Sequence, residues 1–302
     1  MLSPAHLTRL FYGLRETFDF EKLEEVTLEA NPATFDEKKA RLFTELGVTR
    51  VSLGIQSFTP HVLKTLGREH SAQEASEAVG ILKQADMPSV NIDLMFSIPG
   101  QSIQDWEDTV RHAISLNPDH ISAYNLTYEE DTAFFESLRR GEMSQNEDHD
   151  ADHFHLADEL LTAAGFDHYE TSNYAKPGHV SSHNQGYWAA EDYLGLGPSA
   201  VSTLGDNRHK NVPDTSRYVA QIQTIGNAIH ESEHIDPEAR RLERIALGLR
   251  TKNGIPLDLL DAVGKSQAQI LAAEGLAKIT DQSFILIQRG RALVDPIAAD
   301  LV

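Results

Sequence analysis

Asp93 is a residue whose type and sequence setting suggest a chemical role. It lies inside the apolar run of residues 90–101, which ends in Pro99-Gly100 and is typical of a strand buried on both faces. Because a bare carboxylate is costly to bury, we expect Asp93 either to face a polar cavity or to hold a hydrogen-bond donor. A ligand contact and a structural cap for a neighbouring backbone both meet that requirement, and this stretch alone does not separate them.

Polar side chains also stand near the carboxyl ends of the other predicted strands. They are Glu29 and Asn31, then Gln56, then Asp93, then Asn125 and Thr127. A single such residue would mean little, because strand ends are often polar. Active sites of α/β barrels are built at the carboxyl ends of the strands, so polar residues at four strand ends in succession predict a ligand site there.

The elements that must position these residues alternate strictly. Strands are predicted over residues 25–32, 50–57, 90–99 and 120–127. Helices are predicted from Pro4, behind a Ser3 N-cap, and over residues 35–46, 71–85 and 103–116. The crossovers are long enough for parallel pairing. The sequence therefore predicts an α/β fold, a (β/α) barrel or a doubly wound sheet. The strands lack the GxGxxG turn expected for dinucleotides.

The later part of the chain is predicted to differ. An acidic helical stretch covers residues 134–164, one strand covers 165–175, and a polar connector covers 203–225. From Pro237, helices followed by a hairpin at residues 276–288 resemble a winged-helix module. We expect residues 1–218 to form the partial barrel and residues 219–302 a smaller C-terminal domain. Such modules often bind DNA, but the acidic chain favours a packing or docking role.

Composition excludes several classes of function. The 302 residues carry a formal net charge of −20, which argues against nucleic acid and against an anionic membrane surface as partners. No apolar run is long enough to span a bilayer, and we expect a cytoplasmic protein. Cysteine is absent. Disulfides, thiolate nucleophiles, thiolate zinc and any cysteine-held iron–sulfur cluster are therefore excluded for this chain.

Two groups of histidines are candidate ligands. His149 and His153 lie one helical turn apart in the acidic stretch and could chelate a divalent metal, but charge-dense helix faces are usually only solvated and no HExxH motif is present. His183 precedes Tyr187 and Trp188, and could offer an imidazole ligand beside stacking aromatic rings. Ordinary packing around a satisfied histidine fits the second group equally well.

A series of motifs gives the sequence a family resemblance. In order they are LEANP (residues 28–32), LGIQSF (53–58), LGR (66–68), NIDL (91–94), IPGQ (98–101), HYETSNYAKP (168–177) and HNQGYW (183–188). The set resembles the oxygen-independent coproporphyrinogen III oxidase-like proteins of the radical S-adenosylmethionine (SAM) superfamily. Within them it is most similar to the heme chaperone branch, for which HNxxYW is characteristic. The resemblance covers essentially all of the chain.

The resemblance implies an incomplete parallel (β/α) barrel of radical SAM type whose strand ends hold SAM against a [4Fe-4S] cluster. By motif, Glu29, Gln56, Arg68 and Asp93 fall where the family contacts SAM, and His183 falls where heme chaperones engage heme. Arg68 could pair with the methionine carboxylate, and acid and amide groups could bind the ribose and the amine. The catalytic residues stay unassigned.

The sequence departs from the family at its start. The family's C-x3-C-x2-C cluster loop and its GGGTP strand end would both precede the first residue, and no cysteine occurs anywhere. We expect Met1 to be an internal start in a longer reading frame. The favoured function is a heme chaperone that binds heme and passes it to acceptor proteins. The alternatives are oxidative decarboxylation of coproporphyrinogen III in porphyrin biosynthesis, or a cluster-free barrel that acts through its histidine-rich helix.

Overall fold

The structure is a computed structural model that describes residues 2–127, 136, 139–140 and 147–302. The chain divides into two compact units, Met1–Ser181 and Ser182–Val302. This division falls earlier than the predicted boundary between residues 218 and 219, which stays a prediction. Among the described residues, no helix is both long enough and apolar enough to cross a membrane.

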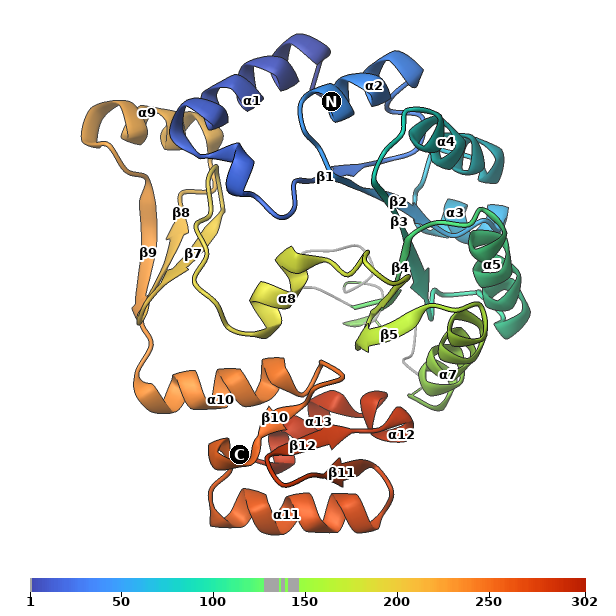
Figure 1. Ribbon diagram of the computed structural model, residues 1–302, viewed down its shortest axis with the longest axis vertical. Coiled ribbons are helices and arrows are strands. Elements are labelled where there is room, and N and C mark those ends of the chain that lie inside the picture. The colour runs from blue at the N-terminus through green and yellow to red at the C-terminus, as the bar shows by residue number, and fades with distance from the viewer. Residues whose placement is uncertain (1, 128–135, 137–138, 141–146) are drawn as a thin grey trace. The chain divides into compact units, whose positions relative to one another are not determined.

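A six-stranded sheet with the strand order β1-β2-β3-β4-β6-β5 forms the centre of the first unit (Figure 1). Its first four strands pair in parallel, as predicted. They are β1 (Thr27–Ala30), β2 (Arg50–Gln56), β3 (Ser89–Phe96) and β4 (His120–Asn125). The prediction of one strand over residues 165–175 is wrong. This stretch makes an antiparallel pair, β5 (Asp167–Glu170) and β6 (Asn173–Ala175), because the chain turns back between them.

Helices connect the parallel strands, and most begin at a side-chain cap. They are α1 (Pro4–Thr17), α2 (Glu37–Glu45), α3 (Pro60–Thr65), α4 (Ala72–Gln84), α5 (Ile103–Ser115) and α7 (Glu147–Ala163), with a short 3₁₀ turn at Phe20–Lys22. Ser71 and Ser102 open α4 and α5 with complete capping boxes, in which serine and acid satisfy each other's backbone N–H groups. The α3 helix was not predicted.

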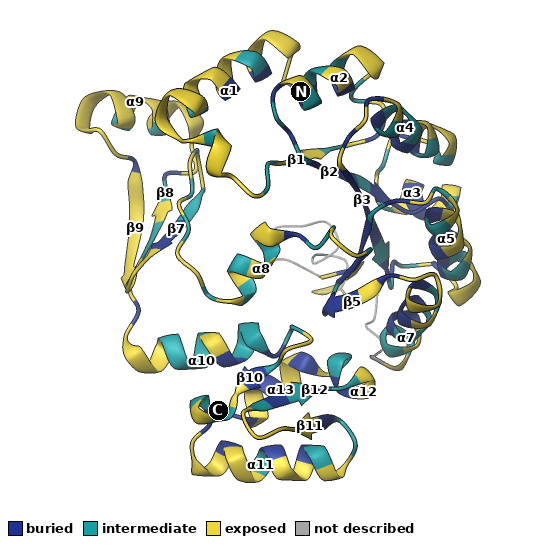
Figure 2. Cartoon of the chain, in the orientation of Figure 1, coloured by how far each residue is buried: buried dark blue, intermediate teal, exposed yellow. Residues whose placement is uncertain are grey.

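The two faces of this sheet differ in chemistry. One face is apolar: Leu53, Ile92 and Ile121 are fully buried, and Phe96 packs against Trp106 of α5 with ring centroids 5.4 Å apart. Residues on the other face alternate with these along each strand and are mostly polar. Figure 2 shows that the central strands are nevertheless buried. Helices α4, α5 and α7 contact the central strand β3, and α7 also contacts β4.

The second unit begins with α8 (Ser182–Trp188) and an antiparallel sheet. The sheet comprises β7 (Val201–Leu204), β8 (Asn207–Asn211) and β9 (Ile229–His234), with α9 (Thr215–Ile225) before β9. The predicted connector over residues 203–225 is therefore wrong. Gly205, at φ +55°, turns β7 into the polar strand β8, and the Asp214 side chain caps α9 by accepting from the Arg217 N–H.

The C-terminal module packs helices against a small antiparallel sheet of order β10-β12-β11 around Phe284 and Ile245. Its elements are α10 (Pro237–Gly248), β10 (Ile255–Pro256), a 3₁₀ turn (Leu257–Leu259), α11 (Ala262–Ala273), β11 (Ala277–Ile279), β12 (Ser283–Leu286), α12 (Gln288–Arg291) and α13 (Val294–Asp300). The predicted succession of helices and hairpin is confirmed. Its assignment to the winged-helix class stays a prediction.

Trp106 offers a test of how the first unit is held together. Its ring is fully buried, and its indole N–H donates to the carbonyl of His153 on α7 over 2.8 Å. Trp106→Phe should lower the free energy of unfolding by about 2 kcal/mol, because the ring shrinks and the carbonyl loses a donor. Urea denaturation measures this loss. Ile103→Ala, at an exposed position of the same helix, should change stability by less than about 0.5 kcal/mol, and an equal loss in both variants would contradict the account.

Candidate functional site

The polar face of the first unit's sheet is the candidate site. We use this name for the side of β1 to β4 opposite the helices, defined by Glu29, Arg50, Ser52, Asn91, Asp93, His120 and Ser122. The strand register places these side chains in rows: Glu29 stands beside Ser52, Ser52 beside Asn91, and Asn91 beside His120. Arg50, Asn91, His120 and Ser122 are buried. Such a group of buried polar side chains requires internal hydrogen bonds.

Asp93 meets the expectation drawn from its sequence setting. Its carboxylate accepts hydrogen bonds from Ser52 Oγ at 2.9 and 3.1 Å and from Asn91 Nδ2 at 2.7 Å. Burial raises the pKa of Asp93, while these hydrogen bonds and the positive charge of Arg50 oppose that rise. Asp93 is therefore both supplied with donors and directed toward other polar groups.

A second group of polar atoms surrounds Gly54, near the carboxyl end of β2. Arg68 Nη1 donates to Asn31 Oδ1 over 3.3 Å. A Cβ built on Gly54 would lie 2.8 Å from that same Asn31 oxygen and 3.2 Å from Gln56 Nε2. Asn31 and Gln56 thus lie against Gly54 at a spot where only glycine fits, and Arg68 bonds to Asn31.

The backbone is unusual at the carboxyl ends of three neighbouring strands. Ala33, Gln56 and Ser97 follow or end β1, β2 and β3 with φ of +60°, +68° and +60°, a left-handed region that non-glycine residues rarely adopt. The pairing of β2 with β3 also shifts register between Gly54 and Gln56. Each such conformation costs about 1–3 kcal/mol, and such costs gather where a structure serves binding or catalysis.

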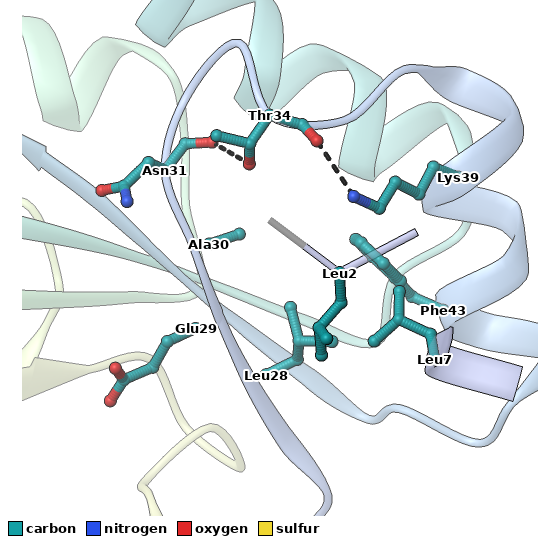
Figure 3. Close-up of a pocket in the computed structure, with 9 residues that line it drawn as sticks. All are labelled: Leu2, Leu7, Leu28, Glu29, Ala30, Asn31, Thr34, Lys39 and Phe43. Atoms are coloured by element: carbon teal, nitrogen blue, oxygen red, sulfur yellow. Dashed lines mark hydrogen bonds between the residues drawn. The ribbon is translucent and has the colours of Figure 1, made fainter. Parts of the chain in front are cut away.

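A cavity of about 400 Å³ lies beside β1 (Figure 3). Its lining is largely apolar: Leu2, Leu7, Leu28, Glu29, Ala30, Asn31, Thr34, Lys39 and Phe43. In Figure 3 the Glu29 carboxylate points away from Leu28 and Leu7, toward the opposite side of the strand. The Lys39 ammonium is used locally, because it donates to the Thr34 carbonyl over 3.1 Å. Glu29 therefore belongs with the polar face rather than with this cavity.

Other predicted positions lie elsewhere. Asn125 donates to Asp150 of α7 over 3.3 Å, away from the polar face, and Thr127 is exposed. The rings of His149 and His153 stand 4.0 Å apart, and His153 Nδ1 bonds to the His149 carbonyl over 2.7 Å. Within the part of the chain that is described, no cluster of three or more His, Cys, Asp or Glu residues could hold a metal ion.

His183 lies on α8, in the second unit, and its side chain is exposed. Its ring meets the Tyr187 ring edge-on at 4.7 Å, and Tyr187 meets Tyr193 in the same manner at 4.8 Å. The guanidinium of Arg250 stands over the Trp188 ring at 5.9 Å. The motif thus places an accessible imidazole in a group of aromatic rings.

Most of the polar face was not predicted from the sequence. Ser52, Asn91, His120, Ser122 and Tyr169 were not predicted as site residues, although all five are buried and hydrogen-bonded to one another or to Asp93. The signal that could have found those on the parallel strands is the alternation of polar and apolar residues along each strand.

Comparison with known proteins gives a consistent result. Residues 4–113 match the radical SAM superfamily. The heme chaperone HemW of Mycobacterium tuberculosis is 34% identical over 303 residues, covering 100% of this chain and 78% of that protein. HemW of Lactococcus lactis is 32% identical over 292 residues, covering 96% of this chain and 76% of that protein.

This chain belongs to the HemW family. The fold agrees, because the solved structure of coproporphyrinogen III oxidase (HemN) from Escherichia coli superposes with a TM-score of 0.82 over 99% of this chain and 74% of that one, at 22% identity. The predicted incomplete barrel of radical SAM type is thereby confirmed.

Membership of the radical SAM superfamily implies SAM and a [4Fe-4S] cluster. The residues of this HemW-family chain do not fit the cluster, because none of the 302 is a cysteine.

Buried neutral histidines should make this protein sensitive to acid. Burial lowers the pKa of His120 well below 6.5. Between its folded pKa and 6.5 the unfolded chain binds the extra proton, so stability should fall as pH drops below 6.5. The contribution of His120 is about 1.4 kcal/mol per pH unit. Urea denaturation at several pH values tests this. His120→Asn should flatten the slope and the exposed control His61→Asn should not; equal slopes in all three proteins would contradict it.

Proposed function

We propose that this chain binds heme through His183 and passes it to acceptor proteins, and that it binds SAM at the polar face. The observation that carries the heme function is the 34% identity, along the whole chain, to a protein named as a heme chaperone. The sites proposed below supply the chemistry for each ligand.

The imidazole of His183 suits a heme ligand. Neutral imidazole nitrogen is a usual axial ligand of heme iron. The ring is exposed, so a bulky macrocycle can reach it. Tyr187 holds the ring edge-on, while Leu194 and Leu196, which are 56% and 60% exposed, offer apolar surface in the same unit. A macrocycle that is held at an accessible surface can also be given up, as a chaperone requires.

The groups around Gly54 and Asp93 suit SAM. Arg68 supplies a planar guanidinium for a carboxylate, and Gln56 supplies both an amide donor and an acceptor. Asp93 and Glu29 supply carboxylates for hydroxyl and ammonium donors. Only glycine at position 54 lets the Asn31 and Gln56 side chains lie this close to the β2 backbone, because a Cβ would press on both.

The alternative function is the oxidative decarboxylation of coproporphyrinogen III. Its support here is the fold shared with HemN, and a fold alone does not specify a reaction. We propose a cytoplasmic location and no nucleic-acid partner, because the chain carries a net charge of −20.

Heme binding by His183 can be tested by titrating hemin into the purified protein and recording the Soret band. Wild type should shift the band with saturation at one heme per chain. His183→Ala should weaken binding by about tenfold or more, because the iron loses its protein ligand. His230→Ala, which removes a partly exposed histidine of the same unit, should bind like wild type. Unchanged binding by His183→Ala would refute the assignment.

SAM binding can be tested by calorimetry of the purified protein. Gly54→Ala should abolish measurable binding, because the new methyl group would press on Asn31 and Gln56. Arg68→Ala should weaken binding by about tenfold or more, the effect of one lost charge-assisted hydrogen bond. Gly80→Ala, where a methyl group meets nothing within 4 Å, serves as the control. Equal SAM affinity in Gly54→Ala and Gly80→Ala would contradict the site.

A further inference from the structure

A continuous chain of hydrogen bonds crosses the polar face and ends at Asp93. The Ser181 N–H donates to the Tyr169 hydroxyl over 3.4 Å, and that hydroxyl lies 2.8 Å from His120 Nε2. His120 Nδ1 lies 2.5 Å from Asn91 Oδ1, and Asn91 Nδ2 donates to Asp93 over 2.7 Å. The side chains of Tyr169, His120 and Asn91 are buried. The chain therefore runs through the interior from β5 to β3.

With Asp93 ionised, the chemistry of the groups gives each bond a direction. An ionised Asp93 carboxylate can only accept, so the Asn91 amide must turn its NH₂ toward Asp93 and its oxygen toward His120. His120 Nδ1 must then carry the proton. Burial lowers the pKa of His120 well below its usual value, so the ring is neutral and Nε2 must accept from the Tyr169 hydroxyl.

Ser52 and Ser122 reinforce this arrangement. Asn91 Nδ2 also lies 2.6 Å from Ser52 Oγ and 3.1 Å from Ser122 Oγ. A hydroxyl can donate or accept, so the two serines are compatible with either orientation of the Asn91 amide. The ionised Asp93 carboxylate and the Nδ1–H tautomer of His120 together select the orientation in which the amide N–H faces Asp93.

We propose that His120 and Tyr169 are positioning residues, which hold the Asn91 amide so that its N–H faces Asp93 and keeps that carboxylate ionised for SAM. The inference rests on the proposed SAM function. If the amide turned over, its oxygen would face the carboxylate, and two acceptors in contact repel each other. Asp93 would then take up a proton more readily and would accept weaker hydrogen bonds from donor groups of the ligand.

Other charged and titratable groups near this chain are Arg50 on β2, Tyr124 on β4, Glu170 on β5, and His179. Arg50 favours the ionised form of Asp93. Burial, followed by the charge of Asp93, raises the pKa of Tyr124, so that tyrosine stays neutral. Burial also raises the pKa of Tyr169, chiefly by desolvation, which keeps its proton available for His120.

The first test is the pH profile of SAM affinity. In wild type, affinity should fall on the acid side as Asp93 gains a proton. His120→Leu should move that fall to higher pH and weaken binding at neutral pH by about tenfold, the effect of one disordered hydrogen bond to a charged group. His120→Asn keeps an N–H at the place of Nδ1, so its profile should stay near that of wild type.

Tyr169→Phe removes the hydroxyl with little change of shape and should shift the profile in the same direction as His120→Leu, by a smaller amount. Tyr174→Phe is the matched control, because Tyr174 is a buried tyrosine of the adjacent strand β6 that stacks on His168. Tyr174→Phe should leave the pH profile of SAM affinity unchanged, whatever its effect on the free energy of unfolding. A profile that is unchanged in His120→Leu, or shifted equally in Tyr174→Phe, would overturn the proposal.

The second test needs no ligand. In ¹⁵N-histidine NMR spectra of the wild-type protein, His120 should appear as the neutral Nδ1–H tautomer down to pH values well below 6.5, the usual pKa. The Nε2–H tautomer, or a ring that takes up a proton near the usual pKa, would overturn the proposal. The NMR measurement distinguishes failure of the proposed SAM function from failure of the positioning proposal. If the protein binds no SAM but shows the Nδ1–H tautomer, the SAM function is refuted and the hydrogen-bond chain is retained.

Discussion

The constraint on which the first unit depends is the burial of a carboxylate against the middle of a parallel sheet. Asp93 stands on β3, between two strands that each supply a polar partner. Leaving such a group without donors costs several times what a single hydrogen bond returns. Ser52 and Asn91 supply the donors directly, and His120 and Tyr169 hold Asn91 in turn. One acidic residue therefore explains a whole row of polar residues on strands that are otherwise apolar.

The sheet can support this arrangement because its two faces do different work. The apolar face packs against α4, α5 and α7 and supplies the burial that stabilises the unit. The polar face contributes less to stability and holds side chains in fixed directions. At the carboxyl ends of the strands, Ala33, Gln56 and Ser97 adopt strained backbone conformations that the packed sheet can sustain. The strained residues and the contacts of Asn31 and Gln56 with Gly54 occur at the same end of the sheet.

Sequence reasoning recovered the alternating elements because caps and apolar runs are local signals. Ser3 caps α1 as predicted, and the buried run at β3 was recognised. It failed where structure depends on distant residues. The polar strand β8 has no apolar pattern in its own sequence, and its hydrogen-bonding partners lie on β7 and β9. Residues 203–225 were therefore predicted to be a connector. His120 is similar: its role depends on Asn91 and Tyr169, which lie 29 and 49 residues away.

The most direct test of the central claim, that the polar face is built to hold SAM, is an experimental structure of this chain determined with SAM added. The account predicts the methionine carboxylate against Arg68, the nucleoside at Gly54 and Gln56, and an oxygen of Asp93 within hydrogen-bond distance of the ligand. A structure in which SAM lies away from all four residues would contradict it.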